Sequence, residues 1–392
     1  MRRSTLKFAT TALALAPLAW SIPVTLADTT SKLDVGVMMQ TRAEHNWAED
    51  NKGNTFDVNR GSLGEADPVD FYGRRARLNI SGEKDGWKGL ITLAADNTDP
   101  TGAKSRTPEL LYLWAEKSIK TGDFTHILHV GLDQANAQPA YRTSSALLLF
   151  PTTRATALFP APTSAYGLRY QVNHSQFQFS ADVQNNRDQG RADNTESNGL
   201  FYATRAVASL LPGVAVPKLT ESFAGESGLA LTLGLDGTLD HAYVKKSGTT
   251  VYTSSYGTMG ADVVFHMDAL TAIADYRVQT YFVPTTVGNN TTSYALALQA
   301  GYAIPVPAAG IVVEPDLRGS VIDNNIDDEA IVTAYSSKAE AEHGNSGYEG
   351  EVGLNVYFNG HKNKIQLAYQ RWESENSNAN ANILRLQHQF SF

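Results

Sequence analysis

ILRLQHQFSF, residues 383–392, is the stretch that decides the expected fold of this chain. Its side chains alternate between two faces. One face is mostly apolar and aromatic and consists of Leu384, Leu386, His388, Phe390 and Phe392. The other face is polar and consists of Arg385, Gln387, Gln389 and Ser391. A period of two predicts a β-strand, because successive side chains of a strand point to opposite faces.

Two kinds of protein use such a strand. A soluble sheet buries the apolar face in a core, whereas a transmembrane barrel turns that face to lipid and its polar face to a wet lumen. The aromatic end of the chain, with Phe390 and Phe392, is similar to the C-terminal signal of bacterial outer-membrane barrels. The other strands of the chain decide between the two.

About sixteen segments are predicted to be strands, of roughly the 9–11 residues that a tilted membrane strand needs. They lie at 33–40, 71–83, 87–96, 108–117, 124–132, 166–172, 177–183, 199–210, 227–236, 256–267, 270–281, 292–303, 310–320, 352–358, 365–369 and 383–392. Short turns alternate with longer polar connections, and 185–198, 237–255 and 321–346 are expected as loops. This asymmetry is typical of outer-membrane barrels, so the predicted fold is all-β, an antiparallel transmembrane barrel of about 16 strands.

One segment, 133–164, interrupts the rhythm. It contains prolines at 139, 151, 160 and 162 and the apolar run LLLF at 147–150. Proline excludes a central strand, and the run is too apolar for a surface loop. We expect this third loop to fold inward and to pack against the inner wall of the barrel.

The first 27 residues predict a secretory signal peptide. An apolar run at 8–20 follows three basic residues, which are Arg2, Arg3 and Lys7. Cleavage is expected after Ala27, and no later apolar run reaches the ~18 residues of a membrane helix. The expected organisation is a signal peptide at 1–27 and a barrel domain at 28–392 in the bacterial outer membrane, with 133–164 as the constriction loop.

Composition excludes several classes of function. The 392 residues include no cysteine, so neither disulfides nor thiol chemistry are expected. The formal net charge is −8, which argues against nucleic acid as a partner. The mean hydropathy of −0.27 fits a barrel whose lipid and lumen faces average out.

No catalytic or metal-binding pattern is visible in the sequence. The nine histidines lie apart, and His126 and His129 fall on opposite faces of a predicted strand. Neither a G-x-S-x-G sequence nor a Walker motif occurs. We therefore expect no metal and no cofactor. A barrel enzyme that acts on lipids would need a Ser–His pair on the lipid-facing rim, and the sequence nominates none.

By the same alternation, the lumen wall carries charges of both signs. Its expected basic residues are Arg75, Arg77, Lys88, Arg169, Arg205, Arg277, Arg318, Lys364 and Arg385. Its expected acidic residues are Asp34, Glu83, Asp96, Asp182, Asp275, Glu314 and Asp316. We assign five of the basic residues to the path of anions, namely Arg75, Arg77, Arg169, Arg205 and Arg277. Arg74 is expected to point outward at the rim.

Two further arginines, Arg142 and Arg154, lie in the segment 133–164, where Asp133 is the one acidic residue. If this segment forms the constriction, both arginines sit where the field is strongest and favour anions. The alternative is that they pair with carboxylates of the wall and only fix the loop. The segment 321–346, in contrast, has six acidic residues and one basic residue.

Four stretches resemble the phosphate-selective porin O/P family. They are FYGRRARLNISGEKDGWKGLITLAADN at 71–97, TSSALLLFPTTRATALFPAP at 143–162, MGADVVFHMDALTAIADYRVQ at 259–279 and FNGHKNKIQLAYQRW at 358–372. The first is similar to an early strand pair of that family, the second to its third loop, which folds into the pore, and the others to later hairpins. The resemblance implies a sixteen-stranded trimeric porin whose pore passes anions.

The function predicted from the sequence is an outer-membrane porin for passive diffusion of small hydrophilic solutes, with anions such as phosphate as the finer expectation. The expected partners are outer-membrane lipid, further copies of the chain in a homotrimer, and the solutes themselves. The alternative from a different class is a structural or adhesive barrel whose acidic outer loops bind a partner or divalent cations. An open conduit through the membrane separates the two.

Overall fold

A computed structural model describes most of the barrel domain. The described residues are 31–46, 55–57, 62–64, 70–96, 108–137, 139, 147–151, 164–185, 200–217, 220–222, 224, 226, 228–247, 250–282, 291–323, 346–374 and 380–392. The signal peptide predicted for residues 1–27 lies outside them. Within the described ranges, no helix is long and apolar enough to cross a membrane.

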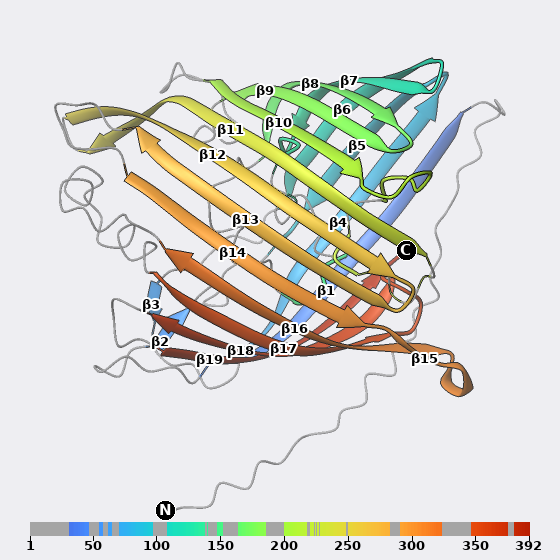
Figure 1. Cartoon of the computed structure of the whole chain (residues 1–392), viewed down its shortest axis with the longest axis vertical. Helices are drawn as coiled ribbons and strands as arrows, with labels where there is room; N and C mark the ends of the chain where they lie inside the picture. Colours follow the sequence, from blue (N-terminus) through green and yellow to red (C-terminus); the bar gives the residue numbers. More distant parts are fainter. Residues whose placement is uncertain are drawn as a thin grey trace, which may run out of the picture.

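The described strands form one large antiparallel sheet of 17 strands, of which 16 are long (Figure 1). The long strands are β1 (Lys32–Asn46), β4 (Asp70–Lys84), β5 (Trp87–Ala94), β6 (Glu109–Thr121), β7 (Phe124–Asp133), β8 (Ala165–His174), β9 (Phe177–Asn185), β10 (Leu200–Ser209), β11 (Leu229–Ser247), β12 (Thr250–Met267), β13 (Leu270–Phe282), β14 (Thr291–Tyr302), β16 (Ile311–Asp323), β17 (Gly347–Tyr357), β18 (Asn363–Ser374) and β19 (Asn380–Ser391). The smaller elements are β15 (Ile304–Val306), which pairs with β16, a 3-10 turn at Pro307–Ala309, and a separate hairpin of β2 (Thr55–Asp57) and β3 (Ser62–Gly64).

The first and last strands pair with each other, and this closes the barrel. β19 pairs with one edge of β1, and β4 pairs with the other edge. At the seam, the Val37 N–H donates to the Phe392 carbonyl over 2.9 Å, and the Phe392 N–H donates to the Val37 carbonyl over 3.0 Å. The stretch 383–392 is therefore the closing strand, and the predicted all-β antiparallel barrel of about 16 strands is confirmed.

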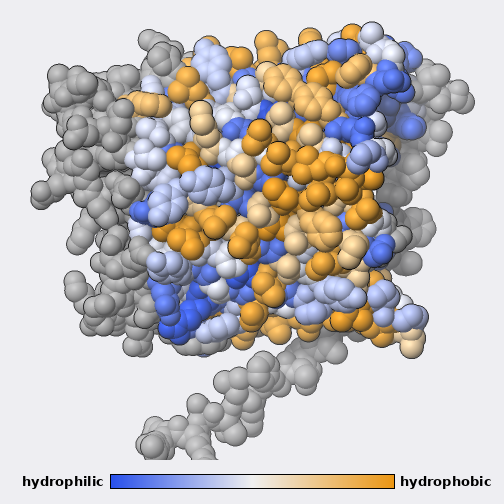
Figure 2. Space-filling model, in the orientation of Figure 1, coloured by the Kyte–Doolittle hydropathy of each residue, from blue (hydrophilic) through white to orange (hydrophobic). Residues whose placement is uncertain are grey.

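The side chains of the strands divide between an apolar outer face and a polar inner face. On β19, Leu384 and Leu386 are 39% and 47% exposed, whereas Arg385 and Gln387 are buried. Other strands expose large apolar side chains in the same way, among them Leu128, Leu168, Leu235, Met259, Leu298, Leu317 and Val352. Figure 2 shows hydrophobic side chains gathered in a band across the strands on one side of the barrel. An apolar band around a polar interior is the arrangement of a transmembrane barrel.

Short connections gather at one end of the barrel, which we call the turn end. The hairpins β4–β5, β6–β7, β8–β9 and β12–β13 are each joined there by two residues. Connections such as β1 to β4 and β7 to β8 lie at the opposite end, which we call the loop end, and are much longer. The asymmetry predicted from the sequence is therefore present.

The prediction of a loop at 237–255 is wrong. β11 and β12 continue through this stretch and stay paired as far as Ser247 and Thr250, with one shift of register after Asp240. Figure 1 shows the hairpin extending beyond its neighbours at the loop end. β12 begins with TVYT at 250–253, and β-branched and aromatic residues favour an extended backbone. Charged residues interrupt the apolar alternation there, and for this reason the sequence pattern did not predict strands.

One connection at the turn end is long. It joins β10 to β11 through residues 210–228, whereas the β8–β9 and β12–β13 turns beside it have two residues each. Near its start, the Val216 N–H donates to the Ser175 carbonyl of the β8–β9 turn over 2.8 Å. At its finish, the Asp268 N–H of the β12–β13 turn donates to the Gly228 carbonyl over 2.7 Å. The connection therefore begins and finishes at the rim of the barrel.

Substitution of Leu298 tests the apolar band. Leu298 points outward from β14 and is 53% exposed. We expect Leu298→Arg to lower the free energy of unfolding by about 2–4 kcal/mol, because a charge near the middle of the bilayer loses its hydration. The measurement is a guanidinium titration of the barrel in lipid vesicles.

Tyr302→Arg is the matched control, because Tyr302 lies on the same face at the turn end of the same strand and is equally exposed. Near the membrane–water interface, the loss in the free energy of unfolding should stay below about 1 kcal/mol. Equal losses for the two variants would contradict the position of the band.

Candidate pore lining

Basic side chains gather on the sector of the inner wall formed by β18, β19, β1 and β4. They are Arg42, Arg74, Arg75, Arg77, Lys364 and Arg385. Among the described residues, the carboxylates that form ion pairs with them are Glu44 and Asp96. The basic groups of this sector therefore outnumber the carboxylates that pair with them directly.

Two groups of this sector donate to neutral oxygens. The Lys364 Nζ atom donates to the Leu148 carbonyl over 2.8 Å, and Arg74 Nη1 donates to Gln40 Oε1 over 3.0 Å. These two hydrogen bonds therefore use uncharged acceptors, a backbone carbonyl and a side-chain amide, rather than carboxylates.

The orientation of Arg74 differs from the prediction, which placed it on the outer face. The register between β1 and β4 shifts, so that Gln40 pairs with Arg75 and Thr41 pairs with Gly73. Arg74 is the extra residue of this β-bulge, and a bulge re-aims the side chain that it carries. Strict alternation fails at this point, and Arg74 joins Arg75 on the inner face.

Arg75 and Arg77 both face Asp96, which follows β5. Arg75 Nε lies 3.5 Å from Asp96 Oδ2, and Arg77 Nε donates to the two carboxylate oxygens over 3.2 and 3.1 Å. Their side chains are 19% and 15% exposed. The structure therefore brings these two predicted residues together, around one carboxylate, where solvent still reaches them.

The other three predicted arginines are held by aspartates on the wall from β7 to β13. The partners are Asp133 and Asp182 for Arg169, Asp236 and Asp262 for Arg205, and Asp236 and Asp275 for Arg277. Asp236 joins Arg205 to Arg277, whereas Arg169 forms a separate group. All three arginines are at most 8% exposed. On this side of the barrel the five aspartates outnumber the three arginines that they hold.

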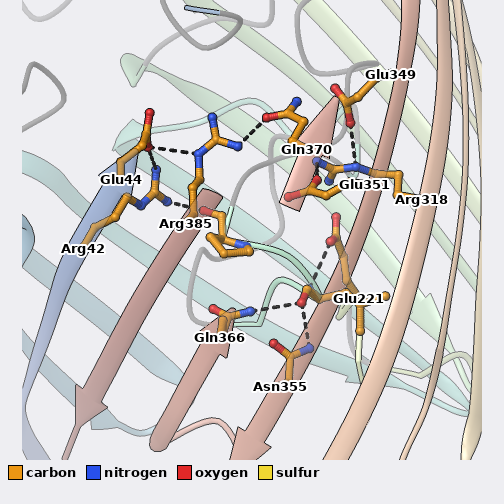
Figure 3. A network of polar contacts seen from close by, with 12 residues as sticks. Arg42, Glu44, Glu221, Arg318, Glu349, Glu351, Asn355, Gln366, Gln370 and Arg385 are labelled. Atoms are coloured by element: carbon orange, nitrogen blue, oxygen red, sulfur yellow. Dashed lines mark hydrogen bonds and ion pairs between the residues drawn. The ribbon is translucent and has the colours of Figure 1, made fainter. Parts of the chain in front are cut away.

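An acidic sector lies next to the basic one, on β16 and β17. Its carboxylates are Glu314, Asp316, Glu349 and Glu351. Arg318 projects among them and donates through Nε to Glu349 over 2.9 Å and through Nη2 to Glu351. Figure 3 shows this group facing Arg42, Glu44 and Arg385 of the basic sector.

Residues 147–151, from the predicted third loop, contact both sectors. The Leu149 carbonyl accepts hydrogen bonds from Asn355 Nδ2 over 2.8 Å and from Gln366 Nε2 over 3.0 Å (Figure 3). Both donors are buried side chains of the inner wall, on β17 and β18. The Leu149 carbonyl accepts hydrogen bonds that water would otherwise accept. These bonds fix the backbone of the segment 147–151 on the wall.

The next two residues extend the contact. The Phe150 ring lies 4.7 Å from the Arg318 guanidinium carbon, in a cation–π arrangement. The Pro151 carbonyl accepts a hydrogen bond from Arg42 Nη2. Phe150 is fully buried. Polar contacts and one aromatic contact therefore hold the segment.

Two glycines of the wall make room for these residues. A Cβ atom on Gly301 would lie 2.9 Å from Leu149 Cδ1, and one on Gly353 would lie 3.0 Å from Phe150 Cε1. Both distances are shorter than ordinary van der Waals contact. A side chain at Gly301 or Gly353 would therefore crowd Leu149 or Phe150 as well as the neighbouring Glu314 or Asp316 carboxylate.

Arg142 and Arg154 lie outside the described residues, as does most of the segment 133–164. Sequence reasoning missed several residues that the structure brings into the barrel interior, among them Arg42, Glu221, Asp236, Asp262, Glu349 and Glu351. Arg42 continues the alternation of Gln40, which could have extended the first strand by several residues. Glu221 lies in the connection 210–228 and gives no local signal. In the described part of the chain, no group of three His, Asp or Glu side chains could hold a metal ion.

Comparisons with known proteins agree with this architecture. No protein-family model and no curated protein matches the sequence. Among solved structures, the anion-selective porin from Comamonas acidovorans matches at 12% identity, over 92% of this chain and 100% of that chain, with a TM-score of 0.56. OprB of Pseudomonas putida matches at 11% identity over 92% and 94%, with a TM-score of 0.56. OmpT of Vibrio cholerae matches at 10% identity over 94% and 99%, with a TM-score of 0.55. The chain therefore has the barrel fold of outer-membrane porins.

Gly353→Ala tests the fit of the segment 147–151. The added methyl group would overlap the Asp316 carboxylate and approach the Phe150 ring, and both are held by further contacts. We expect the free energy of unfolding to fall by about 1–3 kcal/mol, the usual cost of overpacking. Guanidinium unfolding in lipid vesicles measures this. Gly350→Ala is the control on the same strand, because nothing lies within 4 Å of its Cβ position. A loss as large in the control would show that strand propensity, and not the packing of Phe150, is responsible.

Proposed function

We propose that the protein is a porin of the bacterial outer membrane, through which small hydrophilic solutes diffuse passively. The observation that carries the proposal is the closed barrel with an apolar outer face and a charged, hydrogen-bonding interior. The apolar outer face suits contact with lipid, and the polar inner face suits contact with water. The bacterial outer membrane is the location of this barrel, and the signal peptide predicted at 1–27 fits export to it.

We also propose that the pore prefers anions such as phosphate. The support is the excess of basic groups over the carboxylates that pair with them on β18, β19, β1 and β4, together with the contact of residues 147–151 with that sector. On this proposal the segment 133–164 is the constriction loop, and Arg142 and Arg154 lie in the narrow part of the pore. Arg75 and Arg77 continue the path, because they keep access to solvent.

The remaining predicted residues, Arg169, Arg205 and Arg277, have a weaker role in this proposal. Their carboxylate partners offset their charge, so they shape the wall more than they attract anions. We further propose that the barrel is a homotrimer in the membrane, as the resemblance of its sequence motifs implies. Migration as a trimer on unheated gels tests this assembly.

The reversal potential in a planar bilayer under a salt gradient tests the selectivity. We expect the wild-type channel to show an anion-selective potential and the double variant Arg142→Ala/Arg154→Ala to lose most of it. The physical reason is that charges in a narrow, low-dielectric passage control the local ion concentration.

Arg371→Ala is the control, since Arg371 is exposed and pairs with Glu373 rather than facing the lumen. It should leave the reversal potential unchanged. A cation-selective wild type would overturn the anion preference and show that the acidic sector dominates. The absence of any conductance would overturn the porin function and favour the adhesive alternative.

A further inference from the structure

We propose that the connection 210–228 is a second pore element, a crossbar at the turn end of the lumen that holds residues 147–151 in place. In this arrangement Glu221 is a positioning residue: it fixes the segment that narrows the pore and so sets the width of the passage. The inference deepens the proposed porin function and rests on it.

The crossbar spans the mouth of the barrel. It leaves the wall at β10, where Gln176 Nε2 donates to the Leu211 carbonyl over 3.0 Å, and it returns to the wall at β11. Its middle, however, contacts β16 and β17, which the strands β11–β14 separate from β10 in the sheet. A connection between adjacent strands reaches such a distant part of the wall only by crossing the lumen.

Ser222 anchors the crossbar on that distant wall. Its hydroxyl donates to Glu314 Oε2 over 2.7 Å and accepts from the Tyr357 hydroxyl over 3.0 Å. The Ser222 carbonyl lies 2.8 Å from His361 Nε2, in the turn between β17 and β18. Ser222 is 1% exposed, so these contacts form away from solvent. The anchor therefore joins the crossbar to two strands and one turn.

Glu221 joins the crossbar to the segment from the loop end. Its N–H donates to the Leu147 carbonyl over 3.2 Å, and its side-chain Oε2 accepts from the Leu149 N–H over 3.3 Å. Figure 3 shows the Glu221 side chain beside the groups that hold this segment on the wall. Glu221 is fully buried. Backbone and side chain together form a two-point latch between elements that come from opposite ends of the barrel.

A pocket of about 80 Å³ lies on the other side of the crossbar. Val216, Pro217 and Thr220 of the crossbar line it, and the facing wall contributes Ser180 and Arg205 among others. On this proposal the pocket marks the passage that remains beside the crossbar. Release of the latch would let the crossbar and the segment 147–151 move apart and widen the route.

Single-channel conductance of Glu221 variants tests the proposal. Glu221→Ala should raise the conductance roughly twofold, since it removes the acceptor for the Leu149 N–H and loosens the constriction. Glu221→Gln keeps a side-chain oxygen at that place and should restore the wild-type conductance. Glu226→Ala is the matched control, because it removes an exposed carboxylate from the same connection. Heat-modifiable migration on gels verifies that every variant forms a barrel.

A reversible covalent latch provides the second measurement. The chain has no cysteine, so the pair Leu147→Cys/Glu221→Cys introduces the only two thiols. Oxidised protein should form an intramolecular disulfide and show wild-type conductance. Addition of a reductant in the same bilayer should raise the conductance to the value of Glu221→Ala.

Wild-type conductance in Glu221→Ala, or failure of the two cysteines to cross-link in a folded barrel, would overturn the proposal. An equal increase in Glu221→Ala and Glu221→Gln would also overturn it, because charge and not the latch would then set the conductance. A wild type without conductance would overturn the porin function itself. In that case the yield of the disulfide still decides whether the two elements meet.

Discussion

The constraint on which this structure depends is that a backbone in lipid must satisfy its own hydrogen bonds. Water is absent from the bilayer core, so every N–H and C=O group there needs a partner within the protein. A sheet meets this requirement only if its edges join. The pairing of β1 with β19 joins them, and the backbone hydrogen bonds between Val37 and Phe392 complete the seam. The strands of the closed sheet satisfy their backbone hydrogen bonds, but their outer side chains still face lipid. These side chains therefore have to be apolar.

In the closed barrel the outer face is apolar, so the charged side chains of the strands lie in the interior. The wall holds many charged side chains within a small space and pairs them in groups, such as Asp236 between Arg205 and Arg277. The exception is the sector around Arg42, where carbonyl groups of the segment 147–151 take the place of carboxylates. Gly301 and Gly353 leave room in the wall for the same segment and for the neighbouring carboxylates. The interior thus has arginines held by carboxylates on one side and a chain segment held through its own carbonyl groups on the other.

The sequence predicts those parts of this structure that depend on the two-residue alternation of apolar and polar side chains. The strand count, the antiparallel order and the closing strand follow from alternation, because lipid selects one face of every strand. Prediction fails where another influence decides. A β-bulge turns Arg74 inward, and the hairpin of β11 and β12 extends through a stretch whose polar residues conceal its strands. The contacts of Glu221 depend on a chain crossing the lumen, which no local pattern encodes. Arg142 and Arg154 remain predictions of the sequence alone.

Pairing of the first strand with the last has a consequence for biogenesis. The contact between Val37 and Phe392 joins positions at nearly opposite ends of the chain. Contacts of high sequence separation form slowly, because the entropy of a large loop is lost before any bond compensates for it. Until β19 arrives, the edges of β1 and β18 are both open, and open edges promote aggregation. The chain therefore depends on being kept unfolded and unaggregated between its synthesis and its insertion, and its final strand is the step that commits it to the membrane.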